Sequence, residues 1–151
     1  MEQAEEIGWW SGNQPATGFE KQISLVLPEA KSWSTSIRMW GHEESDDAHV
    51  IYSDDTKNTV EEIVFRLDAN KISPELVRRI CLLAQQLGCA LLTTEYEILA
   101  ANETMVLAAV NHSTAKRFVD DPASTLLGLD RQKLQDQAND RTRDGKKDPP
   151  N

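Results

Sequence analysis

The stretch VEEIVFRLDANKISPELVRRICLLAQQLG, residues 60–88, predicts a β-strand that leads directly into an α-helix. In its first part Ile63, Phe65 and Leu67 occur at every second position, so they share one face of an extended chain. A strand with one apolar face needs another layer to cover that face. The helix that follows is expected to supply that layer.

The helix has clear signals at both ends. Ser73 suits the N-cap, Pro74 suits the first helical position, and Gly88 suits the left-handed position after the last turn. Between these ends the apolar residues recur on one side of the helix, which predicts a stripe that faces a core. The stripe consists of Leu76, Ile80, Leu83, Ala84 and Leu87.

Three stretches upstream predict further strands. Residues 22–27 alternate apolar and polar side chains and are followed by Pro28, which ends a strand. The other two predicted strands are residues 37–41 and 49–53. A polar turn separates these two segments, and another separates 49–53 from the strand at 59–67. Because these last three segments are close in sequence, they predict an antiparallel meander.

Downstream of the helix, residues 90–92 and 97–99 predict two short strands across a turn. Asn102 suits the cap of another helix, and residues 113–118 suit a further short helix. The predicted fold class is therefore α+β, with an antiparallel sheet of about four to five strands and two to three helices packed on one face.

The composition limits the number of domains and the classes of function. The chain has 151 residues, a net charge of −9 and a mean hydropathy of −0.53. We expect a loose N-terminal arm over 1–17, a single α+β domain over 18–128, and a disordered charged tail over 129–151. The acidic balance argues against nucleic acid as a partner, and the lack of a long apolar run argues against a membrane. No secretory signal is recognisable at the N-terminus, so we expect a cytoplasmic protein.

The sequence contains no recognisable catalytic or cofactor motif. The seven glycines are scattered, and none forms a loop that could approach a phosphate. No Gly-x-Ser-x-Gly elbow is present, and His112-Ser113-Thr114 is best interpreted as a helix end followed by a new cap. We therefore expect no catalytic residue, no cofactor and no specific metal site, and an enzyme without a recognisable motif remains the third hypothesis.

The segment 42–62 is strongly acidic, with eight acids against one base, Lys57. Three interpretations are open: a divalent metal site, a solvated hairpin turn, or an acidic docking surface that steers a basic partner. The spacing matches no calcium loop, so no specific metal site is expected and the other two interpretations are favoured. The candidate partner-binding acids are Glu43, Glu44, Asp46, Asp47, Asp54 and Asp55.

Trp40 is the seventh candidate for partner binding. On a strand it shares a face with Arg38 and lies opposite Ile37 and Met39. If Ile37 and Met39 face the core, Trp40 points outward, where it is either exposed or covered by the N-terminal arm. An exposed Trp40 would serve as an interface anchor. Packing in the core or under the arm is the competing interpretation.

Four stretches carry a resemblance to a group of small uncharacterised bacterial α+β proteins. They are residues 31–41, Glu62–Asp68, Leu87–Thr93 and Arg117–Pro122. That resemblance implies no activity and no catalytic residue. In size, acidity and lack of a catalytic motif the chain is also similar in type to immunity proteins of interbacterial toxin systems.

Together these observations favour a non-enzymatic protein-binding protein. The expected function is that of an immunity protein, which neutralises a basic toxin domain through an acidic surface. The alternative is a stand-alone regulatory or accessory module with another protein partner.

Overall fold

A computed structural model describes residues 9–144, apart from the side chains of 129–130 and 138–144. The chain divides into two compact units, Met1–Ala108 and Ala109–Asn151.

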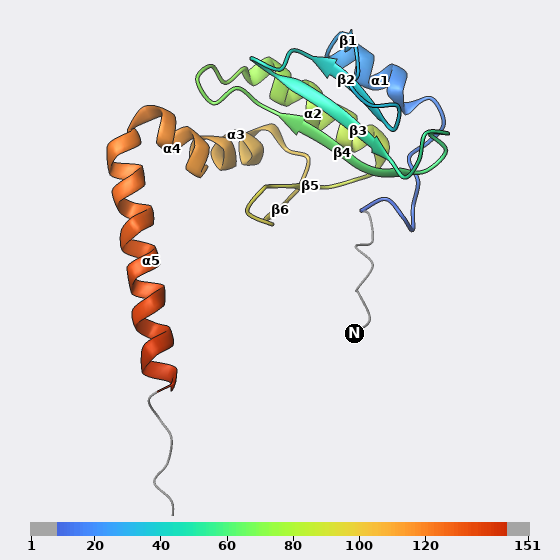
Figure 1. Cartoon of the computed structure of the whole chain (residues 1–151). Coiled ribbons are helices and arrows are strands. Elements are labelled where there is room, and N and C mark those ends of the chain that lie inside the picture. Colours follow the sequence, from blue (N-terminus) through green and yellow to red (C-terminus); the bar gives the residue numbers. More distant parts are fainter. Residues whose placement is uncertain (1–8, 145–151) are drawn as a thin grey trace, which may run out of the picture. The chain divides into compact units, whose positions relative to one another are not determined.

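The first unit is built on a four-stranded antiparallel sheet with the strand order β1-β2-β3-β4 (Figure 1). Its strands are β1 (Glu29–Ala30), β2 (Ile37–Gly41), β3 (Asp47–Tyr52) and β4 (Val60–Arg66). Each strand pairs with the next one in sequence. The predicted meander over 37–41, 49–53 and 59–67 is therefore confirmed.

Two helices, α1 (Phe19–Val26) and α2 (Pro74–Leu87), cover the same face of this sheet (Figure 1). The shared core joins side chains from both helices with those of β2, β3 and β4. Its buried members are Phe19, Ile23, Trp40, Ala48, Val50, Tyr52, Val60 and Leu83. Ile63 and Phe65 pack against this core, as their alternation in the sequence predicts.

The strand predicted over residues 22–27 is wrong, because this segment belongs to α1. The helix buries Phe19 and Ile23, which are one helical turn apart, and leaves Leu25 79% exposed. Apolar residues at 23, 25 and 27 gave a strand-like pattern, although only the helical spacing matches the burial. Gly18 precedes the helix with φ 87°, a left-handed conformation that glycine adopts without strain.

Helix α2 has the predicted boundaries. The Ser73 hydroxyl accepts a hydrogen bond from the Leu76 N–H at 3.2 Å, and Pro74 is the first helical residue. Gly88 ends the helix in the left-handed conformation with φ 68°. The predicted apolar stripe faces inward, and its members Leu76, Ile80, Leu83 and Ala84 are buried.

A small hairpin and a third helix follow α2. Strands β5 (Leu91–Leu92) and β6 (Ile98–Leu99) form a separate two-stranded antiparallel sheet. Helix α3 (Glu103–Asn111) begins where the Asn102 side chain accepts a hydrogen bond from the Met105 N–H at 3.1 Å. These elements agree with the predicted short strands and with the predicted cap.

The second unit contains two further helices, α4 (Thr114–Asp120) and α5 (Pro122–Asp144). Residues 131–137 of α5 expose all their side chains. Helix α5 includes residues 129–144, which belong to the segment predicted as a disordered tail. The rest of that segment, residues 145–151, lies outside the described part of the chain. The predicted domain boundary at residue 128 lies inside this helix.

The N-terminal arm contacts the sheet over part of its described length. Trp10 packs against the core of the first unit. The Gln14 side-chain amide forms two hydrogen bonds with the backbone of Val60. The arm was expected to be loose over 1–17; residues 1–8 lie outside the described part, and residues 10 and 14 contact the sheet.

The fold class is α+β, as predicted. The number and packing of the helices differ from the prediction, since the described residues form five helices and two of them cover the main sheet. No helix among the described residues is both long and apolar enough to cross a bilayer.

Candidate protein-binding surface

The face of the sheet opposite α1 and α2 carries no helix among the described residues of the first unit (Figure 1). Cross-strand pairing places its side chains in three rows. We call this surface the open face and define it by these rows, which are Ile37–Ile51–Glu62, Met39–His49–Val64 and Gly41–Asp47–Arg66. Its centre is thus apolar around one histidine, and charged side chains lie towards its two ends.

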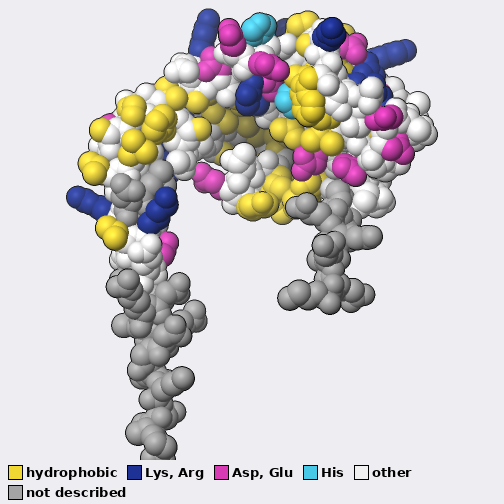
Figure 2. Space-filling model, in the orientation of Figure 1, with side chains coloured by type: hydrophobic (Ala, Val, Ile, Leu, Met, Phe, Trp, Pro, Cys, Tyr) yellow, Lys and Arg dark blue, Asp and Glu magenta, His cyan; other side chains and the backbone are white. Residues whose placement is uncertain are grey.

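The centre of the open face is partly accessible. Val64 is 40% exposed, Ile37, Ile51 and His49 are half-buried, and Met39 is buried. Figure 2 shows hydrophobic side chains over the strands with histidine, basic and acidic side chains beside them. An apolar centre bordered by polar groups is the usual arrangement of a protein-binding surface.

Asp47 anchors one end of the open face. Its side chain is 3% exposed, and its carboxylate forms an ion pair with the Arg66 guanidinium. The same guanidinium donates a hydrogen bond to the backbone carbonyl of Glu43. His49 Nε2 lies 3.5 Å from Asp47 Oδ1, and no hydrogen-bond partner is described for this nitrogen. Asp47 is therefore a structural carboxylate and is not available to a partner.

The turn between β2 and β3 supplies acids at this same end. The exposed side chains of Glu43 and Glu44 have no described ion pair or hydrogen bond. Asp46 instead accepts a hydrogen bond from the Asp68 backbone N–H at 2.8 Å. Of the four candidate acids near this turn, the two glutamates are the ones that point charge into solvent.

The turn between β3 and β4 supplies acids at the other end. Asp54 accepts a hydrogen bond from the Thr56 backbone N–H at 2.9 Å, and Asp55 accepts one from the Thr35 hydroxyl at 2.6 Å. Both residues are exposed. Glu62 lies on the open face next to this turn.

The six candidate acids therefore do not form one cluster. The two turns stand at opposite ends of β3, which has six residues. At about 3.3 Å per residue the turns are about 20 Å apart. That separation exceeds the screening length of about 8 Å at physiological salt, so the two acidic ends act as separate charges on either side of the apolar centre.

Trp40 does not belong to this surface. Its side chain is fully buried, and its indole N–H donates to the Ser24 hydroxyl of α1 at 2.9 Å. The Arg38 guanidinium lies over the ring, 5.2 Å from its centroid. Trp40 thus faces the helical layer, and the interpretation as an interface anchor is corrected to packing in the core.

Two residues of the open face, Ile37 and Met39, were not predicted from the sequence. Since Trp40 faces α1, its neighbours Ile37 and Met39 lie on the open face. Met39 pairs with His49, and Ile37 pairs with Ile51. The available signal was the size of the tryptophan: the bulkiest side chain of a short strand gains most from burial, so it should have defined the core face.

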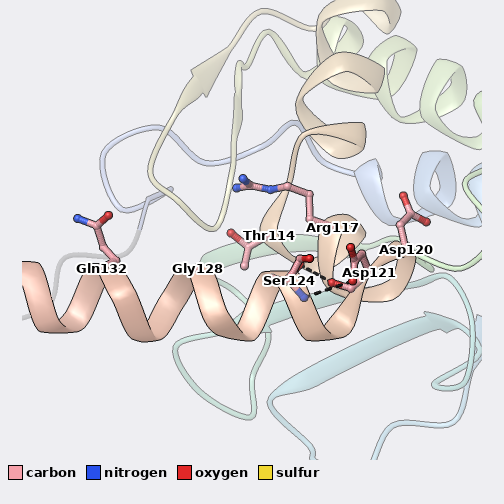
Figure 3. A pocket seen from close by; sticks show the side chains of 8 residues that line it. Thr114, Arg117, Asp120, Asp121, Ser124, Gly128 and Gln132 are labelled. Atoms are coloured by element: carbon pink, nitrogen blue, oxygen red, sulfur yellow. Dashed lines mark hydrogen bonds between the residues drawn. The ribbon is translucent and has the colours of Figure 1, made fainter.

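The second unit has a shallow groove between α4 and α5 (Figure 3). Asp121 lies in this groove and accepts a hydrogen bond from the Ser124 N–H at 3.2 Å, as a helix-capping carboxylate does. Across the groove, Arg117 projects from α4 (Figure 3). The capping role accounts for Asp121, and Asp120, which also lines the groove, forms an ion pair with Lys116 of the same helix.

No group of three or more His, Cys, Asp or Glu residues in the described part of the chain is arranged to hold a metal ion. The acids of segment 42–62 are spread over the two turns and the strands between them. No protein-family model, no curated protein and no solved structure matches this chain.

Proposed function

We propose that this chain is a protein-binding protein whose open face docks a basic partner. The observation that carries the proposal is the arrangement of charge around the apolar centre. Glu43 and Glu44 border one end of the open face, and Glu62 with the Asp54–Asp55 turn borders the other. A partner with apolar side chains between two groups of Lys or Arg residues matches this pattern.

The charge of the whole first unit supports the same class of partner. Between residues 9 and 108, fifteen Asp and Glu residues stand against eight Lys and Arg residues. Of these bases, Arg38, Arg66, Arg78 and Arg79 are held in ion pairs with acids of the same unit. The remaining negative potential steers a basic partner towards the surface and raises its association rate.

The narrower proposal is that the partner is a basic toxin domain, which this chain neutralises as an immunity protein does. Its support is the acidic surface together with the similarity in type to immunity proteins. A regulatory or accessory role is the alternative, and it uses the same surface with a partner that is not toxic.

A photo-cross-linking residue at Ile51 tests where the partner binds. Ile51 lies on the open face in β3, between Ile37 and Glu62 of the neighbouring strands. Leu82, which is 49% exposed on α2, provides the matched control position. In the native host the Ile51 probe should capture one basic protein that the Leu82 probe does not. Equal capture at both positions, or capture of an acidic protein, would contradict the proposal.

Charge reversal then tests the role of the acids. Glu44→Lys and Glu97→Lys change the net charge equally, but Glu97 lies in the β5–β6 turn, away from the open face. Against the captured partner at low salt, Glu44→Lys should slow association about tenfold, and Glu97→Lys should have a smaller effect. High salt should reduce the difference. Equal effects of the two variants would show that only net charge matters.

A growth assay separates the two narrower proposals. The captured partner is expressed alone in a sensitive host and then together with this chain. Growth arrest that co-expression relieves supports neutralisation of a toxin. A partner that does not arrest growth supports the regulatory module instead.

A further inference from the structure

The outer edge of β4 pairs with no other strand of the described sheet. The sheet has two edge strands, β1 with two residues and β4 with seven. A long edge strand presents backbone N–H and C=O groups that can pair with another strand. Val64, near the middle of β4, is also one of the large hydrophobic residues that remain exposed.

The hydrogen bonds fix which backbone groups of β4 point outward. The Tyr52 N–H donates to the Ser36 carbonyl, so the backbone of Tyr52 faces β2. Because the direction alternates along a strand, the backbones of Ile51 and His49 face β4, where they pair with Glu62 and Val64.

The intervening residues of β4, Ile63 and Phe65, therefore point their N–H and C=O groups away from the sheet. No hydrogen bond from these outer groups is described among residues 9–144. These two positions provide four free backbone groups along the edge.

The start of the same edge already holds a substitute for a strand. Gln14 Oε1 accepts a hydrogen bond from the Val60 N–H at 2.7 Å, and Gln14 Nε2 donates to the Val60 carbonyl at 2.9 Å. The side-chain amide thus makes the two bonds that a neighbouring peptide group would make. It closes the edge at Val60 and leaves residues 62–66 accessible.

We propose that this accessible edge binds the same edge of a second copy, so that two β4 strands pair in antiparallel orientation about Val64. In this register Ile63 pairs with Phe65 of the partner subunit through backbone hydrogen bonds. Val64 meets Val64 of the partner subunit directly. Glu62 lies opposite Arg66 of the partner subunit, which gives two opposite-charge pairs per dimer.

The side chains are available for these contacts. Glu62 has no described ion pair, and the Arg66 side chain is 55% exposed. Arg66 already binds Asp47 and the Glu43 carbonyl, but a guanidinium has five N–H donors. It therefore retains donors for Glu62 of the partner subunit.

Charge and burial select this register over its neighbours. Pairing centred on Ile63 would place Glu62 opposite Val64 and bring Arg66 to the edge at Val60 that Gln14 occupies. Pairing centred on Glu62 would place two glutamates directly opposite each other, which is destabilising. Pairing centred on Phe65 would place Arg66 opposite Val64. Only the register about Val64 pairs Glu62 with Arg66 and joins the two valines.

Disulfide trapping tests the register. In an antiparallel pair, residues opposite each other without mutual hydrogen bonds have Cα atoms about 4.5 Å apart, which suits a disulfide. Val64→Cys should therefore cross-link two copies under mild oxidation. Glu62→Cys is the matched control, since its two copies would lie about 13 Å apart along the strands.

The expected result is cross-linking of Val64→Cys at least tenfold faster than that of Glu62→Cys. The native chain supplies the background from Cys81 and Cys89, whose thiols are free. Equal rates for the two variants would overturn the proposed register.

Sedimentation equilibrium of the full chain tests the dimer without cross-linking. Glu62→Lys should raise the dissociation constant of the dimer about tenfold, because two attractive pairs become repulsive. Glu61→Lys makes the same charge change outside the paired rows and should have a clearly smaller effect. Thermal melting establishes that both variants fold. A native chain that remains monomeric at millimolar concentration, or equal effects of the two variants, would overturn the proposal.

Discussion

The Tyr52 hydroxyl donates a hydrogen bond to Glu20 Oε1 at 3.0 Å, and this bond links the end of β3 to α1. Tyr52 is 3% exposed. Burial and the bond to the Glu20 carboxylate raise the pKa of Tyr52 from 10.0 to about 12. Both effects disfavour the phenolate, because ionisation would place a second negative charge beside Glu20 in a buried position.

The raised pKa of Tyr52 predicts a loss of stability in alkali. Because the pKa of the folded state exceeds that of the unfolded state, the stabilisation is complete below pH 10 and is lost as the pH rises towards about 12. The sequence has two tyrosines, so Tyr96→Phe leaves Tyr52 as the only one. Its absorbance titration should have a midpoint near pH 12, whereas a midpoint near 10 would contradict the described bond.

Trp40 should be the most sensitive tryptophan in the described structure. Trp40→Ala removes a fully buried side chain and its bond to Ser24, so it should lower the free energy of unfolding by about 3–5 kcal/mol. Trp33 is 71% exposed, and Trp33→Ala should change it by less than about 0.5 kcal/mol. Urea unfolding followed by circular dichroism measures both. Similar losses would mean that Trp40 is not part of the core.

Asp47→Asn should destabilise the fold although it lies in the acidic segment. It weakens a charged hydrogen bond from Arg66 to a buried carboxylate, so the free energy of unfolding should fall by about 1–3 kcal/mol. Glu44→Gln removes an exposed charge with no described partner and should change stability by less than about 0.5 kcal/mol. Chemical denaturation distinguishes the two. A neutral Asp47→Asn would assign this acid to the solvated turn.

Removal of residues 131–151 should leave the stability of the chain within about 1 kcal/mol. The described side chains of this segment, 131–137, are all exposed, so their loss uncovers little apolar surface. The melting temperature of the truncated chain measures the change. A large fall would indicate that α5 contributes to packing beyond the contacts described for it.

The sequence predicted best where local signals and core packing agree. Helix α2 has a capping serine, a proline in its first turn, a periodic apolar stripe and a terminal glycine, so four independent signals gave the same boundaries. The strands β2, β3 and β4 have polar turns between them, which gave the meander.

The first helix could not be recognised from the same kind of signal. Over eight residues, apolar side chains at 19, 23 and 26 fit a helix, while those at 23, 25 and 27 fit a strand. Which pattern prevails depends on the sheet that buries Phe19 and Ile23, and this sheet is formed by residues far along the chain. Periodicity alone cannot resolve such a short segment.

That error carried over to the candidate site. Without a helix at 19–26 the sequence pattern offers no layer that covers Trp40, and the alternation then allows Ile37 and Met39 to face the core. The six acids were predicted from composition, but their distribution over both ends of β3 depends on the strand pairing. The ion pair between Asp47 of β3 and Arg66 of β4 had no signal in the local sequence.

The two hydrogen bonds between the Gln14 side chain and the Val60 backbone also affect the kinetics of folding. All strand pairs of the main sheet join neighbours in sequence, so their loops close at low entropic cost. The Gln14 amide instead meets Val60 across 46 positions. We expect the strands to form first and the N-terminal arm to dock after the transition state. Gln14→Ala should then speed unfolding and leave the folding rate nearly unchanged in stopped-flow experiments. A matching slowdown of folding would instead place the arm in the folding nucleus.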